Sequence, residues 1–406
     1  MAEYFNLVGK LNIGKETERF VPISKNTYDS GWMKTRVLFN CISDTNRIPL
    51  VAEAGRWVDD KKNNPIKTFS KNTTNADGTT TKGTKIDVAF DKRFDKEEIA
   101  KIAGFRKFVI DTDNTPQRYK LMDAVKAFED GDITDELKEE VGVSTLEEAK
   151  AALAKSEAKK KEFIFEHDFV EHLIKVLKSD KFKDTLWNIS GQLDVNYNPN
   201  KGTFYKSYKV NRITLAREDS EPIAELKLDL FFGEDAFDAD NYDETGKATI
   251  SGFVKYYDNS VKANGFVPVV VAVREDEKKM KALQKKFVVE DGEVRNIGMT
   301  VSIIEGAQRV PLTREMLDEE TLEDLDTGLI EWSDVVHQYG NNVVGERISE
   351  LRYDKLNADK RTAQVTAYSI EDLVPAIAQT EESDEDDEED DNSVPFSLDD
   401  EDEDDL

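Results

Sequence analysis

Two stretches of this chain, far apart in the sequence, alternate apolar residues with mostly polar ones around an internal glycine. In residues 4–13 the positions Phe5, Leu7, Gly9, Leu11 and Ile13 fall on every second residue, and residues 187–197 repeat the spacing around Gly191. Both stretches also fit the pattern Asn-x-x-Gly-x-Leu-x-(Ile/Val). A period of two predicts half-buried strands, and a glycine inside a strand marks a bend or a close approach of backbone. Because the first strand of a small barrel needs such a bend, we predict β-domains built on these strands.

The strand that follows each stretch repeats as well, since residues 32–37 resemble residues 204–209. This second match predicts a diverged tandem of two β-domains. The sequence between them carries helix signals, with a capping box at residues 144–147 and an apolar stripe over residues 165–177. Residues 313–339 read as helical with a break near Gly328. The predicted fold class is therefore mostly β with helical insertions (α+β).

These signals divide the chain into five predicted segments. They are a β-barrel-like domain over 1–110, a helical insertion or linker over 111–180, a second β-domain over 181–311, a small helical or mixed segment over 312–376, and a disordered acidic tail over 377–406.

The charge of the chain is concentrated in its last segment. Residues 381–406 hold 17 carboxylates and no cation, so the net charge of −29 becomes −12 when they are subtracted. So dense a block of like charge is expected to stay solvated. The subtraction exposes two basic regions, because residues 1–110 carry 20 Lys and Arg against 14 Asp and Glu, and residues 181–217 carry seven against two. Such asymmetry points to nucleic-acid contact or to an autoinhibitory tail.

The sequence offers little for an enzyme. The three histidines have no metal-ligand spacing, the single cysteine, Cys41, lies in an apolar run that predicts a buried thiol, and no nucleophile motif occurs. Residues 78–85 resemble a phosphate loop only in their glycine spacing and are better interpreted as a hairpin tip. We therefore expect no enzyme activity, no cofactor and no metal. The chain also lacks an apolar stretch of about 20 residues and a signal-peptide pattern, so we expect a cytoplasmic protein without a membrane partner.

Aromatic and basic side chains alternate on the repeated strands. This arrangement suits single-stranded nucleic acid, because unpaired bases stack on aromatic rings while Lys and Arg contact phosphates. Aromatic residues are also common in strands for packing reasons, and for Trp32 alone core packing is an equally good interpretation. The candidate nucleic-acid-binding residues are Trp32, Lys34, Arg36, Trp57, Lys61, Lys62, Tyr197, Lys201, Phe204, Lys206, Tyr208 and Arg212.

With its glycine-bearing strands, aromatic and basic second strands and acidic tail, the chain resembles the single-stranded DNA-binding proteins of tailed bacteriophages and, more loosely, the bacterial ones. The resemblance implies OB-fold barrels, one or two here, that coat single-stranded DNA in replication or recombination within the host cytoplasm. It also implies a tail that docks replication and recombination proteins and competes with DNA. The docking residues would be Val394, Pro395 and Phe396, although in the bacterial proteins the Pro-Phe pair ends the chain, whereas here further acidic residues follow it.

A different class of function stays open. The acidic surface could itself be the active one, as in a scaffold, a host-takeover factor or a DNA mimic that binds a basic partner and ignores DNA. A carboxylate-dependent nuclease or a nucleotide-driven enzyme is a weaker third possibility, because no ordered acidic motif or phosphate loop is present.

Overall fold

The computed structural model describes residues 3–59, 64, 66–75, 78–113, 115–258, 261–340 and 342–381. Strands contain 41% of the residues and helices 28%, which confirms the prediction of a mostly β fold with helices. Most strands join one large mixed sheet. Among the residues described, no helix is long and apolar enough to cross a membrane.

Five strands, including both glycine-bearing stretches, pair in a closed ring in which the last strand pairs with the first; this ring is the first cycle. Its members in order of pairing are β1 (Tyr4–Asn12), β3 (Trp32–Ser43), β4 (Asn46–Trp57), β12 (Thr203–Leu215) and β11 (Leu186–Asn198), which pairs with β1 again. All pairs are antiparallel except β4 with β12. The amphipathic helix α5 (Glu166–Leu177) lies between β4 and β11 in the sequence and buries Phe169, Leu173 and Val176, as its apolar stripe predicts.

The second cycle has the same pairing order. It runs through β13 (Ile223–Phe232), β15 (Ala248–Asp258), β16 (Ala263–Val273), β18 (Asn342–Leu356) and β17 (Arg295–Pro311), which pairs with β13. Here the parallel pair is β16 with β18. Helix α7 (Glu277–Gln284) again comes between the third and fourth strands in chain order.

These pairings correct the predicted domain boundary between residues 180 and 181. The two glycine-bearing stretches are not the first strands of separate domains, because β1 and β11 are direct neighbours, with Phe5 opposite Gly191 and Gly9 opposite Trp187. Side chains at the glycines would collide with backbone, at Gly9 with Ile42 and at Gly191 with Lys209. The glycines therefore permit close approach within a single cycle, and the second cycle begins only at Ile223.

The two cycles share one apolar core. Strands β1 and β13 pair directly, from Tyr4 opposite Lys227 to Val8 opposite Ile223. A single cluster of buried side chains runs through both, from Phe5 in the first cycle to Ile297 in the second. Cys41 is fully buried in it, which confirms the predicted core thiol.

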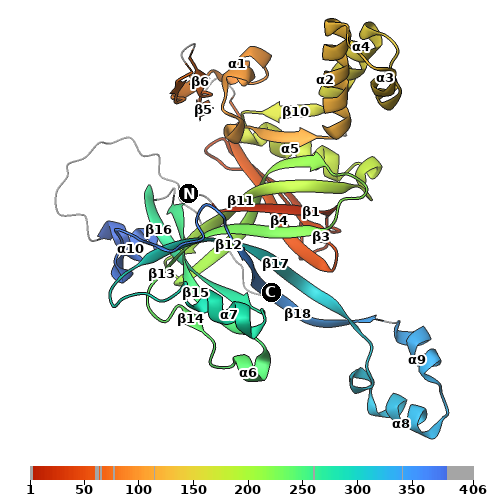
Figure 1. Cartoon of the computed structure of the whole chain (residues 1–406), viewed down its shortest axis with the longest axis vertical. Coiled ribbons are helices and arrows are strands. Elements are labelled where there is room, and N and C mark those ends of the chain that lie inside the picture. Colours follow the sequence, from red (N-terminus) through yellow and green to blue (C-terminus); the bar gives the residue numbers. More distant parts are fainter. Residues whose placement is uncertain are drawn as a thin grey trace.

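Two excursions leave this body (Figure 1). The first contains α2 (Thr115–Asp130), α3 (Asp135–Val141) and α4 (Leu146–Glu157), which pack on a small core of their own around Leu121. The second lies at the far end of the long β17–β18 ribbon and contains α8 (Glu319–Thr327) and α9 (Trp332–Tyr339), separated at Gly328 as predicted.

The remaining elements are short. They are β2 (Ile23–Thr27), β5 (Ile66–Phe69), β6 (Thr73–Thr74), β7 (Thr80–Thr81), β8 (Lys85–Val88), α1 (Lys96–Lys101), β9 (Phe108–Asp111), β10 (Lys160–Phe163), β14 (Phe237–Asp238), α6 (Tyr242–Thr245), β19 (Gln364–Val365), α10 (Ala376–Glu381) and the 3₁₀ turns η1 (Phe90–Lys92), η2 (Gly104–Arg106), η3 (Asp180–Phe182), η4 (Arg314–Met316) and η5 (Ile370–Asp372). Strands β6 and β7 form a hairpin, which confirms the interpretation of this loop as a hairpin and not as a phosphate loop.

Candidate nucleic-acid interface

Two tryptophans meet on the outer face of the first cycle. Trp32 at the start of β3 lies opposite Trp57 at the end of β4, and their rings pack edge to face with centroids 5.3 Å apart. The ring of Trp32 covers Gly55, where any side chain would collide with it. Asn64 fixes the end of β4, because its Oδ1 accepts the Trp57 backbone N–H at 2.9 Å. Both tryptophans are half-buried.

The two cations beside the tryptophans share one carboxylate. Lys34 and Arg36 project from the same face of β3, and Glu53 on β4 lies 3.2 Å from the Lys34 Nζ and 3.5 Å from the Arg36 Nε. All three side chains are partly exposed, so solvent weakens the pairing. Glu53 was not among the residues predicted from the sequence, although the alternation along β4 places it on the face of Trp57.

The second repeated strand does not present the corresponding face. Strand β12 runs parallel to β4 with Tyr208 opposite Leu50 and Lys209 opposite Val51. Leu50 is a core residue, so Tyr208 faces inward, where it packs edge-on against Phe5 with ring centroids 5.5 Å apart. Burial raises the pKa of the Tyr208 hydroxyl. The prediction that β12 presents an aromatic and basic face corresponding to that of β3 is therefore wrong for Tyr208.

Lys209 takes the outward position instead. Its Nζ lies 3.1 Å from the Glu166 Oε1 at the first turn of α5. Burial raises the pKa of Glu166, and Lys209 acts against that shift. Glu53 and Asp194 are also close enough to perturb these groups. The outer face thus continues from a basic region near Trp32 into a mixed-charge region near α5.

Three of the predicted residues line a groove between the two cycles. Arg36, Lys206 and Tyr208 line a hollow of about 440 Å³ together with residues of β16, β17 and β18. The Lys206 Nζ donates to the backbone oxygen of Pro268 at 2.8 Å, and burial lowers the pKa of this lysine. Glu305 and Glu350 also line the groove. Lys206 therefore links the two cycles where it lines the groove.

The other aromatic candidates form a separate cluster. Tyr197 and Phe204 have ring centroids 4.7 Å apart, and Phe204 packs edge-on against Tyr256 of the second cycle at 6.1 Å. This cluster joins β11, β12 and β15. Tyr205, which was not among the predicted residues, is the more exposed aromatic of β12, with 51% of its surface accessible.

The remaining predicted residues are scattered. Lys201 lies in the exposed turn between β11 and β12, and Arg212 is exposed near the end of β12. Lys61, Lys62 and the tail residues Val394, Pro395 and Phe396 lie outside the described residues. In the described part of the chain no group of three or more His, Cys, Asp or Glu side chains could hold a metal ion.

No protein-family model and no curated protein matches this chain. The most specific feature of the candidate interface is the Trp32–Trp57 pair beside Lys34 and Arg36.

Proposed function

We propose that the chain binds single-stranded DNA with little sequence preference, and that each cycle of strands is an OB-type barrel. The pairing order supports the barrel assignment. In both cycles the first strand pairs with the second and fourth, the third and fifth strands are parallel, and a helix precedes the fourth strand. OB-folds bind oligonucleotides on the face of their second and third strands. In the first cycle these are β3 and β4.

The observation that carries the proposal is the position of the tryptophan pair on those two strands. Trp32 and Trp57 offer aromatic faces and edges to unpaired bases. Lys34 and Arg36 lie two and four residues after Trp32 on the same face of β3, and they would contact the phosphates. A duplex hides the faces of its bases, so this surface favours single strands. The chain would act by binding alone, coating DNA during phage replication or recombination in the host cytoplasm.

Glu53 and the acidic tail would both moderate this binding. Glu53 compensates the charge of Lys34 and Arg36 until a phosphate displaces it. The 17 carboxylates of residues 381–406 provide a counter-ligand for the basic regions and a docking segment for replication or recombination proteins.

Fluorescence anisotropy with labelled oligo-dT and a matched duplex, at two salt concentrations, tests the proposal. We expect binding to oligo-dT that weakens steeply with salt, and weak binding to the duplex. Trp32→Ala and Trp57→Ala should each weaken oligo-dT binding about 5- to 150-fold, since stacking contributes ~1–3 kcal/mol per base. Trp332→Ala on the distant helix α9 is the matched control, and circular dichroism verifies that each variant is folded.

The alternative is an acidic interaction factor that does not bind DNA. It is favoured by the tip of the β17–β18 ribbon, where residues 312–340 hold nine carboxylates and one arginine. Exposed apolar side chains accompany them, with Leu329 75% and Trp332 38% accessible. Absence of binding to either oligonucleotide at low salt would favour this alternative and reject the DNA-binding proposal.

A further inference from the structure

A basic lobe with a small core of its own follows the strand that ends at Trp57. Residues 66–107 form this lobe, which contains the β5–β8 hairpin, the β6–β7 hairpin, α1 and the turns η1 and η2 (Figure 1). Ile66, Val88 and Ile102 are buried together at its centre. The lobe carries ten Lys and Arg against six Asp and Glu, whereas the chain as a whole has a net charge of −29.

The solvent face of the β5–β8 hairpin combines aromatic and basic side chains. Phe69 lies opposite Lys85, and Lys67 comes two residues before Phe69, so the period of two places all three on one face. Ile66 and Thr68, which alternate with them, are buried on the other face. Lys67 and Lys85 are exposed, and Phe69 is half-buried. This face of the hairpin is therefore open to a ligand.

Arg106 joins this face to a second ring. Its guanidinium carbon lies 4.8 Å from the centroid of the Phe69 ring and 5.4 Å from that of the Phe105 ring. The backbone supports this arrangement, because the Ala103 N–H donates to the Phe69 oxygen at 2.9 Å and the Arg106 N–H donates to the Ala103 oxygen at 3.0 Å. Phe105 is 71% exposed. An open ring beside a planar guanidinium is a stacking surface for an unpaired base.

The cations of this face are free to contact phosphates. In the part of the chain that the structure describes, the ion pairs of the lobe are made by Arg93, Lys101 and Lys107. Lys67, Lys85 and Arg106 take part in none of them. Asp87 lies opposite Lys67 in the hairpin, so one carboxylate accompanies three cations and the face stays positive.

The lobe lies within reach of a strand that is bound to the tryptophan pair. Asn64 exchanges hydrogen bonds of 2.9 and 3.3 Å with the backbone of Trp57. Phe69 is five residues after Asn64, so their Cα atoms are at most about 18 Å apart. This is the length of about five nucleotides at a stacked spacing of ~3.4 Å, and a site on one OB-fold covers about 4–16 nucleotides. One strand can therefore contact both surfaces.

The corresponding face of the second cycle is covered by the chain itself. Tyr368 packs edge-on against Phe231 and Phe266, with ring centroids 5.8 and 5.2 Å apart. Its hydroxyl accepts from the Lys255 Nζ at 2.5 Å. The Phe266 N–H donates to the Val374 oxygen at 2.9 Å, and Phe266 is only 1% exposed. Tyr368 thus already fills the aromatic cluster of that face, whereas the ring of Phe105 is open.

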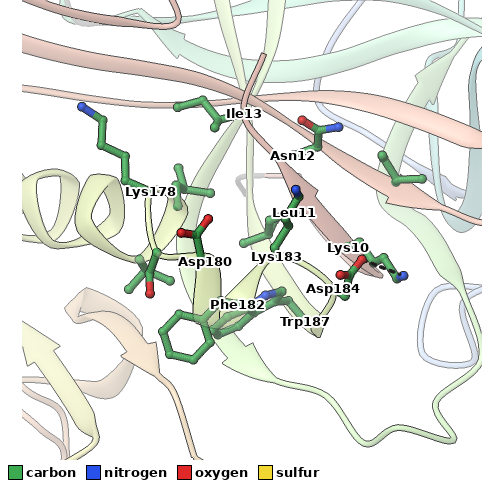
Figure 2. Close-up of a pocket in the computed structure, with 14 residues that line it drawn as sticks. Lys10, Leu11, Asn12, Ile13, Lys178, Asp180, Phe182, Lys183, Asp184 and Trp187 are labelled. Atoms are coloured by element: carbon green, nitrogen blue, oxygen red, sulfur yellow. Dashed lines mark hydrogen bonds and ion pairs between the residues drawn. The ribbon is translucent and has the colours of Figure 1, made fainter. Parts of the chain in front are cut away.

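The hollow shown in Figure 2 is also less suited to a strand. It has a volume of about 400 Å³ and lies at the end of β1, where Lys178 and Lys183 line it together with Asp180. Its two rings pack on each other, because Phe182 and Trp187 have centroids 5.4 Å apart and Trp187 is fully buried. A buried indole offers no face to a base, so the lobe is the better second contact.

We propose that Phe69, Phe105 and Arg106, with Lys67 and Lys85, form a second contact for single-stranded DNA. A base stacks on Phe105 and Arg106, and the two lysines contact phosphates of the strand that leaves Trp57. This inference rests on the proposed function and extends its site from the barrel to the lobe. The tryptophan pair and the lobe then bind one strand together, and each raises the effective concentration of the strand at the other.

The first test is ¹⁹F NMR of the full chain carrying Phe105→Trp, labelled with 5-fluorotryptophan and titrated with oligo-dT of about 16 nucleotides. The wild type has four tryptophans, so the variant adds one resonance, and Trp32→Phe and Trp57→Phe assign the two that report the barrel face. We expect oligo-dT to shift the added resonance together with those of Trp32 and Trp57. Tyr257→Trp, at an exposed position of β15 in the second cycle, is the matched control, and its added resonance should not move.

Shifts of the Trp32 and Trp57 resonances without a shift of the added one would overturn this inference and leave the proposed function standing. A shift of the added resonance alone would support the lobe and reject the tryptophan pair as the site. Absence of any shift would reject both proposals.

Anisotropy with the same oligo-dT measures the contribution of the lobe. Phe105→Ala should weaken binding about 5- to 150-fold, the range expected for one stacked base, and Phe105→Tyr should retain it. Phe94→Ala removes another exposed ring of the lobe, beside Arg93, which is already paired with Asp168, and it should have no effect. Equal affinities of wild type and Phe105→Ala would contradict the second contact.

The salt dependence tests the lysines. Lys67→Gln/Lys85→Gln should lower the slope of log K against log salt by about one to two. Lys285→Gln/Lys286→Gln on the exposed surface after α7 is the matched control. An unchanged slope in the lobe variant would mean that these lysines do not contact phosphates.

Discussion

At the scale of single residues, Glu53 has the most specific expected effect on binding. It lies between Lys34 and Arg36 and compensates their charge. Glu53→Gln keeps the shape of the side chain and releases both cations, so oligo-dT binding should tighten about 2- to 5-fold at low salt, and the gain should shrink as salt screens the added charge. Asp123→Asn on the exposed side of α2 is the control for a general loss of negative charge. Unchanged or weaker binding of the Glu53 variant in anisotropy titrations would show that this face does not contact DNA.

Glu3 makes stability depend on pH. Its carboxyl group is buried beside Asp229, whose backbone N–H it accepts at 3.0 Å, and burial raises the pKa of Glu3 to about 8. Because the unfolded chain releases this proton near pH 4.5, the contribution of Glu3 to stability is greatest below that pH, falls as pH rises towards 8 and is constant above it. Glu3→Gln should therefore stabilise the protein at pH 8 relative to wild type by a few kcal/mol, on the order of 1.4 kcal/mol per pH unit crossed, and much less at pH 5. Urea unfolding at both pH values measures this, and Glu16→Gln on the exposed loop after β1 should show no such difference.

At the scale of elements, one buried ion pair fixes the α2–α4 module to the sheet. Arg118 on α2 donates to both oxygens of Asp111 at the end of β9, at 2.5 and 2.8 Å, and to the Ser156 hydroxyl of α4 at 2.9 Å. The Arg118 and Asp111 side chains are only 8% and 3% exposed. Arg118→Ala leaves a buried carboxylate without its partner, so it should destabilise the module by about 3–5 kcal/mol.

Hydrogen exchange shows which elements lose stability in the Arg118→Ala variant. We expect faster exchange in α2, α3 and α4 and little change in β3 and β4, because the module has its own small core. Lys126→Ala on the exposed side of α2 is the matched control. Equal loss of protection throughout the chain would mean that the module and the sheet unfold together.

The sequence predicted whether most segments form a helix or a strand, but it did not predict which strands pair with each other. The alternation around Gly9 and Gly191 correctly predicted strands, and the apolar stripe of residues 165–177 correctly predicted α5. A period of two specifies which side chains share a face, but it does not identify the strand that pairs alongside. For that reason the sequence predicted that β11 begins a second domain and that Tyr208 lies on a binding face of that domain, whereas Tyr208 faces the core of the first cycle. The pairing of Trp32 with Trp57 depends on the β3–β4 hairpin register, which the sequence pattern alone did not supply.

At the scale of the whole molecule, the two cycles are expected to unfold as one unit. They share the β1–β13 pairing and a continuous core, and Lys206 bridges them at the groove. Calorimetry of the full chain should therefore give one main transition, with calorimetric and van't Hoff enthalpies in agreement for this part. Cleavage at a protease site introduced in the exposed loop 217–221, between β12 and β13, should leave the two fragments associated on size exclusion, because β1 would otherwise lose a paired neighbour. Two separated transitions, or fragments that elute apart while still folded, would show that the cycles are independent domains that only touch.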